Sequence, residues 1–245
     1  MNAIDIHNLT KEYNGLLAVN QISLSVSAGE IFGYLGPNGA GKTTTIRMLT
    51  GQLRPTSGQA FVMGCDVVED RENLKPQIGV VSDSHNLYGR MSGRDNLRFF
   101  ASLYGVGKKR VEEILVTIGL NDRKKDKVET YSNGMKQRLV IGRALLHRPK
   151  VLFLDEPTRG LDPNVAREIR SLVKQLAREG MTVFLTTHYM EEADTLSDRV
   201  AIIHQGQIVA MDTPEQLKAS YGAGQTVTLE DVFVRLTGRK LLEGV

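Results

Sequence analysis

Residues 36–43 read Gly36-Pro37-Asn38-Gly39-Ala40-Gly41-Lys42-Thr43 and match the pattern G-x-x-x-x-G-K-[ST]. An apolar, strand-like stretch (31–35) precedes them, and a helix-compatible stretch (43–49) follows. Backbone N–H groups can converge on phosphate only where side chains are absent, which explains the glycines. The stretch therefore predicts a nucleotide phosphate loop, in which Lys42 reaches the β- and γ-phosphates and Thr43 binds Mg²⁺. The alternative is a glycine-rich turn without a ligand, and the strand, the spacing, Lys42 and Thr43 all disfavour it.

A second motif, Val-Leu-Phe-Leu-Asp-Glu at 151–156, places two acids at the end of an apolar run. Adjacent strand residues point in different directions, so the two acids should perform different tasks. We expect Asp155 to hold a metal ion and Glu156 to accept a proton from an attacking water. On its own the motif fits a solvated strand end equally well, and the phosphate loop favours the catalytic interpretation.

The surrounding sequence alternates between strand and helix patterns. Strand-like stretches at 3–9, 19–26, 30–35 and 59–62 dominate residues 1–65. Residues 92–147 are mostly helical in pattern, with a charged run at 122–127 that we predict to be a solvated loop. Residues 150–209 return to α/β alternation. The pattern predicts an α/β core with a parallel sheet, interrupted by a helical insertion.

Composition narrows the function classes. The chain has 245 residues, 41% hydrophobic and 24% charged, which is typical of a soluble globular protein. A formal net charge of +3 gives no support for a nucleic-acid protein with a broad basic face. The single cysteine, Cys65, excludes an intramolecular disulfide and favours a reducing compartment. The sequence shows neither a run of about 18–20 apolar residues nor a signal peptide, so we expect no membrane span.

Taken together, the motifs resemble those of the nucleotide-binding domain of ABC (ATP-binding cassette) proteins, and the resemblance covers nearly the whole chain. Residues 36–43 resemble Walker A, 131–137 (Tyr-Ser-Asn-Gly-Met-Lys-Gln) the ABC signature, 151–156 Walker B and 160–163 (Gly-Leu-Asp-Pro) the D-loop. His188 follows Phe-Leu-Thr-Thr and resembles the switch histidine, and Tyr13 resembles the aromatic residue that stacks on adenine.

The resemblance implies an ABC ATPase fold, which is a P-loop NTPase core with an N-terminal antiparallel β subdomain and an inserted α-helical subdomain. It divides the single domain, 1–245, into four parts. Residues 1–90 form the first part of the core with the β subdomain, and 91–149 the helical subdomain with the signature. Residues 150–215 form the second part of the core, and 216–245 a C-terminal extension.

The resemblance also implies the site residues and ATP with Mg²⁺ as the ligands. The catalytic residues would be Lys42, Glu156 and His188, and the metal ligands Thr43, Asp155 and Asp83. The ATP-binding residues would be Tyr13, Gly36, Pro37, Asn38, Gly39, Ala40, Gly41, Lys42, Thr43, Thr44, Ser132, Gly134 and Asp162. In the family, Ser132 and Gly134 would open a helix of roughly 134–147 and bind the γ-phosphate of the opposite protomer. Ser132 as an ordinary N-cap is the alternative.

Two motifs depart from the family pattern. The signature, commonly Leu-Ser-Gly-Gly-Gln, has Tyr131, Asn133 and Met135 at three positions. Asp83 stands where the family has glutamine, which would place a charged oxygen beside Mg²⁺ and near the γ-phosphate. The alternative is that Asp83 points to solvent or pairs with Arg90 or Arg94.

Within the family, three stretches resemble ATPase subunits of ABC-2-type bacterial exporters of drugs, sodium or polysaccharides. These stretches are 132–139, 87–88 with 92–97, and 229–239. This resemblance implies an ATPase that powers export through a separate membrane permease, contacted near residues 83–100, including Leu87, Tyr88 and Phe99. It also implies a homodimer without nucleic acid, peripheral on the cytoplasmic face of the inner or plasma membrane.

Two other classes of protein are alternatives to an exporter ATPase. The main alternative is a soluble ABC ATPase acting on ribosomes or DNA, which commonly carries two cassettes or long coiled-coil insertions. This sequence shows one cassette and no long heptad segment. A P-loop kinase or GTPase would leave Ser132, Asp162 and His188 unexplained. A neighbouring gene for about six apolar 20-residue segments would favour the exporter.

Overall fold

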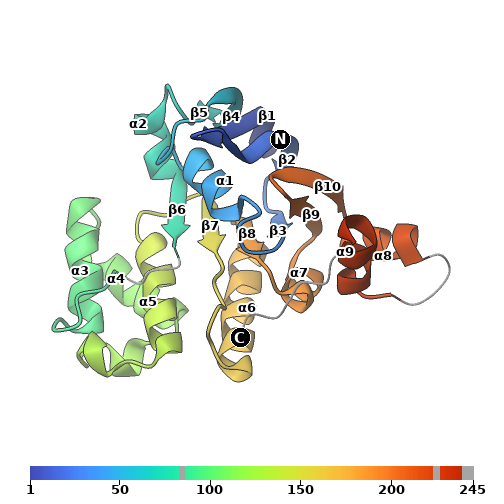
Figure 1. Cartoon of the computed structure of the whole chain (residues 1–245). Helices are drawn as coiled ribbons and strands as arrows, with labels where there is room; N and C mark the ends of the chain where they lie inside the picture. Colours follow the sequence, from blue (N-terminus) through green and yellow to red (C-terminus); the bar gives the residue numbers. More distant parts are fainter. Residues whose placement is uncertain (83–85, 223–226, 239–245) are drawn as a thin grey trace.

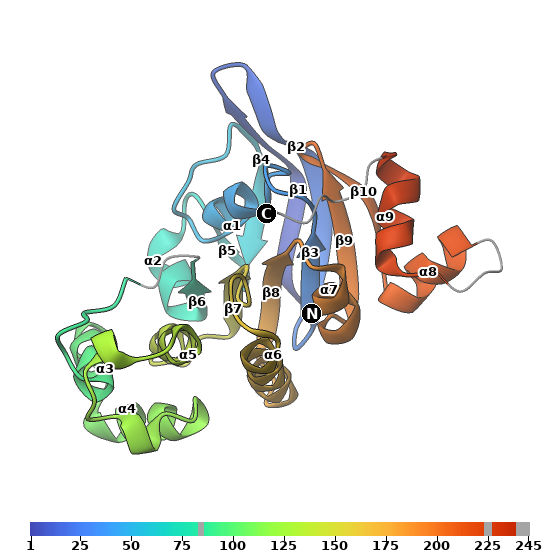
Figure 2. The same cartoon turned by 60° about the horizontal axis from the view of Figure 1, so that its bottom comes forward.

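Two β-sheets organise the chain, and the computed structural model describes residues 1–82, 86–222 and 227–238 (Figures 1 and 2). The first sheet is antiparallel with strand order β2 (Leu16–Ser27), β1 (Asn2–Tyr13), β4 (Ser57–Val62), β5 (Cys65–Asp66). Asn14 and Gly15 join β1 to β2 with φ of 48° and 85°, the left-handed pair that a tight hairpin requires.

The second sheet holds six strands in the order β10 (Gln207–Asp212), β9 (Arg199–His204), β3 (Ile31–Leu35), β8 (Thr182–Thr187), β7 (Val151–Asp155), β6 (Ile78–Val81). Neighbours from β9 to β6 run parallel, and β10 pairs antiparallel with β9. Every residue of β3, β7 and β8 is buried, as expected for parallel strands covered on both faces.

Helix α1 (Lys42–Leu49) lies between the two sheets. Its apolar residues share one hydrophobic cluster with residues of both: Ile46, Met48 and Leu49 from the helix, Ile4 and Val62 from the first sheet, and Phe32, Phe153 and Phe184 from the second. The short α2 (Arg71–Leu74) and the 3₁₀ turn η1 (Lys75–Gln77) lead into β6. This packing fixes the start of α1 against the end of β3.

The opposite face of the second sheet is covered by α5 (Asn133–Ala144) and α6 (Pro163–Arg178). Helices α3 (Gly93–Leu103) and α4 (Lys108–Thr117) pack with α5, and the 3₁₀ turns η2 (Asn121–Arg123) and η3 (Val128–Thr130) connect α4 to α5. We call α3, α4 and α5 with these turns the helical group; it projects from one side of the sheet (Figure 1).

At the other edge of the sheet, α7 (Met190–Leu196), α8 (Pro214–Gly222) and α9 (Leu229–Thr237) pack over β9 (Figure 2). Ala193, Val232 and Phe233 form the centre of this contact. Lys218 Nζ donates a hydrogen bond of 2.6 Å to Asp194 Oδ1 and so joins α8 to α7. Across residues 1–82, 86–222 and 227–238, none of the helices combines the length and hydrophobicity needed to cross a membrane.

Two sequence-based expectations need correction in detail. The helix predicted over roughly 134–147 ends at Ala144, because the chain turns through Arg148 at a φ of 59° before Pro149. The run 122–127 is not a fully solvated loop. It begins inside η2, and Lys124 Nζ lies 2.9 Å from Glu112 Oε2 on α4.

Candidate active site

The topology brings three chain segments to one edge of the second sheet. Strand β8 lies between β3 and β7, with Leu35 opposite Thr187 and Asp155 opposite Thr186. The carboxyl ends of these parallel strands are therefore level, and the residues that follow them meet there. These residues are the loop after β3, Glu156 after β7 and His188 after β8.

The glycines of the loop are required by the backbone. Gly39 and Gly41 have φ of 78° and 105°, in the left-handed region that favours glycine. A Cβ at Gly36 would press on the carbonyl oxygen of Ile203, and one at Gly41 on that of Ala18. The loop therefore presents its backbone directly before the first residues of α1, where helix N–H groups favour an anion.

Lys42 lies inside the loop and is almost completely buried. Its Nζ donates hydrogen bonds to the carbonyl oxygens of Gly36 at 2.8 Å and Pro37 at 3.1 Å. It also forms an ion pair with Glu156, at 3.0 Å between Nζ and Oε1, with side chains only 5% and 9% exposed. A buried charge of this kind is stabilised only when it is paired.

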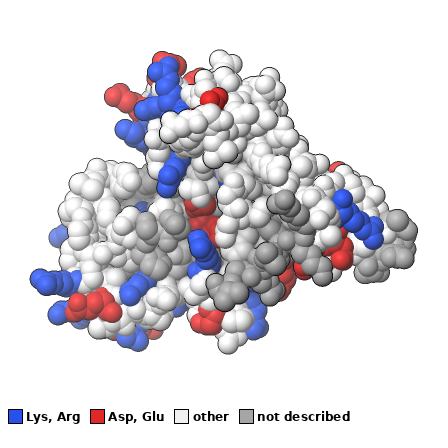
Figure 3. Space-filling model, in the orientation of Figure 1, with Lys and Arg blue, Asp and Glu red and all other residues white. Residues whose placement is uncertain are grey.

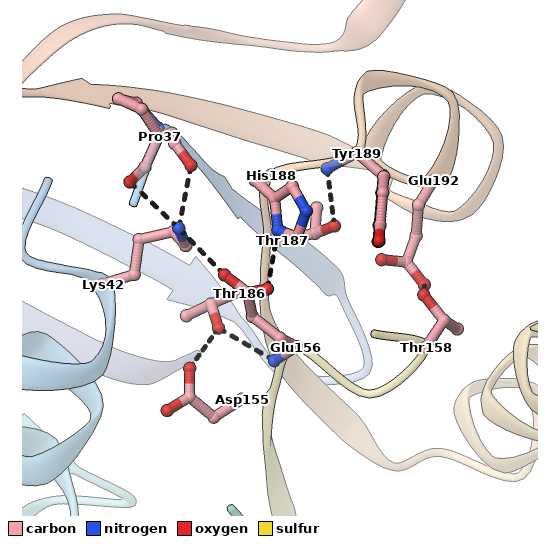
Figure 4. Close-up of polar contacts among 11 residues, drawn as sticks. Pro37, Lys42, Asp155, Glu156, Thr158, Thr186, Thr187, His188, Tyr189 and Glu192 are labelled. Carbon is pink, nitrogen blue, oxygen red and sulfur yellow. Dashed lines mark hydrogen bonds and ion pairs between the residues drawn. The ribbon is translucent and has the colours of Figure 1, made fainter. Parts of the chain in front are cut away.

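Glu156 connects Lys42 to His188. Its Oε2 lies 2.6 Å from His188 Nδ1, so the carboxylate contacts a basic group through each oxygen (Figure 4). The Glu156 backbone has a φ of 50°, which is uncommon for a residue with a side chain. Its N–H donates to the hydroxyl and the carbonyl oxygen of Thr186, at 3.2 and 3.1 Å, and these bonds help to hold the unusual conformation.

Asp155 and Glu156 have separate partners. Asp155 is buried, and its Oδ1 accepts a hydrogen bond of 2.6 Å from the hydroxyl of Thr186. The two carboxylates thus face different groups, and the left-handed φ of Glu156, just beyond the strand end, separates them.

A pocket opens over these residues. It is lined by residues of the loop and α1, the two acids, and two further residues: Asn38, Gly39, Gly41, Lys42, Thr43, Thr44, Asp155, Glu156, Ala18 and Arg159. Acidic and basic side chains lie next to each other in a hollow beside the helical group (Figure 3). The mixed charge and the exposed loop backbone fit a polyanionic ligand with a bound cation.

The donor set is compatible with Mg²⁺. Thr43 and Asp155 offer a hydroxyl and a carboxylate in the same pocket, and Mg²⁺ prefers oxygen ligands, commonly one or two from protein and the rest from phosphate and water. In the part of the chain that the structure describes, no three or more His, Cys, Asp or Glu side chains are grouped to hold a metal ion. Asp83, the third metal ligand expected from the sequence, lies outside the described residues.

Comparison with known proteins decides the family. The family model "ABC transporter" matches residues 19–159. The chain belongs to the ABC transporter family. The sequence-based prediction of an ABC ATPase fold and an ATP-binding subunit is thereby confirmed.

Two similar proteins are ATP-binding proteins of drug resistance. The linearmycin resistance ATP-binding protein LnrL of Bacillus subtilis is 43% identical over 230 residues, which cover 92% of this chain and 74% of the relative. The daunorubicin/doxorubicin resistance ATP-binding protein DrrA of Streptomyces peucetius is 40% identical over 245 residues, covering 98% and 74%.

Solved ABC structures agree with the fold. An ATP-binding subunit of an ABC transporter superposes with a TM-score of 0.84 at 26% identity, covering 96% of this chain and 99% of the other. The ATP-binding cassette MJ0796, a dimer bound to ADP and inorganic phosphate in a post-hydrolysis state, gives a TM-score of 0.76 at 25% identity, covering 86% and 98%.

Eight described residues expected at the ABC nucleotide site are not among those lining the pocket. Gly36, Pro37 and Ala40 belong to the same loop, and His188 contacts Glu156. The other four are Ser132, Asp162, Gly134 and Tyr13. The Ser132 hydroxyl caps α5 by accepting from Met135 N at 3.2 Å, and Asp162 caps α6. Gly134 is buried where α5 crosses α6, and a Cβ there would collide with Val165. Tyr13 is 42% exposed at the tip of the β1–β2 hairpin, with Lys11 Nζ 5.3 Å from its ring centroid.

Two described neighbours of the acids are not indicated by the sequence motifs. Thr186 holds both Asp155 and the Glu156 backbone, and Arg159 lines the pocket. Arg159 was within reach of sequence analysis, because it lies three residues after Glu156 in the same loop. The only sequence feature that marks Thr186 is that it is a polar residue directly after an apolar, strand-like run.

Proposed function

We propose that this chain hydrolyses ATP to power export of an antibiotic or similar drug through a separate membrane permease. The observation that carries the catalytic part is the contact of Glu156 with both Lys42, at 3.0 Å, and His188, at 2.6 Å, at the edge of the pocket. The relatives active in linearmycin and daunorubicin/doxorubicin resistance support the substrate class.

In the proposed reaction, Lys42 binds the β- and γ-phosphates, and backbone N–H groups of the loop between Asn38 and Thr44 donate hydrogen bonds to them. Phosphate oxygens would compete with the Glu156 carboxylate for the Lys42 ammonium. Glu156 would then be available to accept a proton from the attacking water, and His188 to contact that water and the γ-phosphate.

We assign the expected divalent cation to Thr43 and Asp155, with Asp83 as a third ligand predicted from sequence alone. Bound Mg²⁺ would neutralise the charge that develops on the phosphates. The hydrogen bond from Thr186 leaves the second oxygen of Asp155 available for this role.

We further propose that two copies close head to tail over two ATP molecules. Ser132, Gly134 and Asp162 would then act on the nucleotide of the partner copy, and Tyr13 would stack on adenine. The exposed start of α5 at Ser132 supports this arrangement, because a helix N-terminus there can meet an anion from outside the chain. The peripheral cytoplasmic location and the four-part domain division remain predictions of the same proposal.

The test is purification of the tagged chain from detergent-solubilised membranes of its host. The proposal expects a stable complex with a protein of several apolar helices, whose ATP turnover rises with an exported compound. Co-sedimentation with ribosomes or DNA, with no membrane complex, would support the soluble alternative and contradict the proposal.

A further inference from the structure

Glu192 is a buried acid that the proposed reaction does not use. It lies on α7, and the side chain has no exposed surface. Its Oε1 accepts a hydrogen bond of 2.8 Å from the hydroxyl of Thr158. Among the described residues, its Oε2 has no hydrogen-bond partner. A fully buried carboxyl needs a reason to be there.

The Glu192–Thr158 bond joins the same two loops as the Glu156–His188 contact. Thr158 follows Glu156 by two residues, and Glu192 follows His188 by four, about one helical turn. The two contacts lie side by side between the end of β7 and the start of α7 (Figure 4). The Glu192–Thr158 hydrogen bond is therefore placed to stabilise the Glu156–His188 contact.

The loop after Glu156 requires such support. The left-handed φ of 50° at Glu156 persists only if the surroundings hold it. Beyond Glu156, Arg159 N donates to the Glu156 carbonyl at 3.1 Å and Leu161 N to the Thr158 carbonyl at 3.2 Å, so residues 156–161 form two successive turns. Thr158 is the buried point through which these turns are attached to α7.

The surroundings of Glu192 shift its pKa upward. Burial raises its pKa and the like charge of Glu156 adds to this, while Thr187, Thr158 and Arg170 lower it. Arg170 Nε on α6 lies 4.0 Å from Glu192 Oε1, which is beyond hydrogen-bond distance. Arg170 Nη1 lies 3.7 Å from Oε1 of the exposed Glu191. The Thr158 bond needs only an oxygen acceptor, which a glutamine amide also supplies.

We propose that Glu192 is a positioning residue, which holds Thr158 and thereby keeps the Glu156 carboxylate in place against Lys42 and His188. This inference rests on the proposed role of Glu156 in hydrolysis. It predicts an effect on turnover rather than on ATP binding, because neither Glu192 nor Thr158 lines the pocket.

The experiment compares kcat and KM for ATP in the purified chain and four variants. Glu192→Ala and Thr158→Val should lower kcat about 10- to 100-fold, the scale of a misplaced catalytic group, with KM changed by less than about threefold. Glu192→Gln and Thr158→Ser retain the bond and should stay within about threefold of the unmodified chain. The double variant Glu192→Ala/Thr158→Val should be no slower than the slower single variant, because both remove one interaction.

Glu191→Gln is the matched control, since Glu191 precedes Glu192 on α7 but is 82% exposed, and its turnover should not change. The inference is overturned if Glu192→Ala and Thr158→Val keep normal kcat, if Glu192→Gln is as slow as Glu192→Ala, or if the loss lies in KM. If Glu192→Ala does not fold, the kcat values of Thr158→Val and Glu192→Gln test the inference instead. If Glu156→Gln itself keeps normal turnover, the proposed role of Glu156 fails instead.

Discussion

At the scale of single residues, Lys42 and Glu156 balance each other's charge inside the protein. Their ion pair is nearly inaccessible to water, so each group depends on the other or on a ligand that takes its place. Phosphate is such a ligand for Lys42. In the proposed reaction, phosphate would take the place of Glu156 beside Lys42 and so free the carboxylate to take up a proton.

Replacing Lys42 tests the residue at the centre of the loop. Lys42→Ala should nearly abolish ATP hydrolysis, because backbone N–H groups alone cannot supply the missing charge at the β/γ-phosphates. It should also lower the free energy of unfolding, since Glu156 is left without its cation. Turnover and thermal unfolding are measured on the same sample, with Lys174→Ala on the exposed side of α6 as control. Near-normal turnover in Lys42→Ala would contradict the assignment.

The sequence predicted some site residues and missed others for a physical reason. The loop and the two acids follow from local chemistry, since glycines, lysine and a threonine must occur in a fixed order beside phosphate. Thr186 and Glu192 instead contact residues that are distant in the sequence, Asp155 and Thr158. The role of Thr186 depends on the pairing of Asp155 with Thr186 between β7 and β8, which no local pattern encodes.

At the scale of elements, the crossing of α5 and α6 depends on Gly134. The helices approach closely enough at this point that a single added methyl group would meet Val165 Cγ1. Both helices begin at capped residues, Ser132 and Asp162. The glycine therefore sets how the two helix starts lie relative to each other.

Gly134→Ala should lower the free energy of unfolding by about 1–3 kcal/mol, the usual effect of overpacking a tight contact. Chemical denaturation measures the change. Val165→Ala in the same chain removes the colliding methyl groups and should restore most of the loss, which makes the double variant the control. If Gly134→Ala is as stable as the unmodified chain, the helices are not held at this distance.

Element prediction succeeded where periodicity was strong. The buried strands β3, β7 and β8 and the amphipathic α6 match their sequence patterns. Helices α7 and α8 were not predicted. Helix α7 has only seven residues and α8 nine, too few for a clear helical period, and both are held by packing against β9, β10 and α9.

At the scale of the whole molecule, an aromatic cluster on α3 and the loop before it lies within the segment expected to meet the permease. Tyr88 and Phe99 are 48% and 40% exposed, and their rings lie 5.2 Å apart. Phe100 joins them, and the Arg143 guanidinium lies 4.8 Å from its ring centroid. Arg143 also donates to the Asn86 carbonyl at 2.9 Å, which holds the adjoining loop.

Phe99→Asp should weaken co-purification with the permease and leave ATP binding by the isolated chain unchanged, because a charge replaces a partly exposed ring on this surface. Pull-down from detergent-solubilised membranes measures the first effect and nucleotide titration the second. Val116→Asp, at an exposed apolar position on α4, is the control. Equal recovery of the permease by both variants would place the docking surface elsewhere.

Dimer formation should depend on ATP. The Glu156→Gln variant should form a dimer in Mg²⁺ and ATP and return to a monomer without nucleotide, because closure persists when hydrolysis is slow. Light scattering during gel filtration measures the mass, and Glu156→Gln combined with Ser132→Arg, which obstructs the α5 start, should remain monomeric. A monomer with ATP bound would contradict the proposed sandwich.

The most direct test of the central claim is the rate of phosphate release by Glu156→Gln at saturating ATP. Glutamine keeps the shape of the side chain but cannot accept a proton. We predict tight ATP binding with hydrolysis slowed by about 10²- to 10⁴-fold, the usual loss when a general base is removed. Unchanged phosphate release at full ATP occupancy would show that Glu156 does not activate the attacking water.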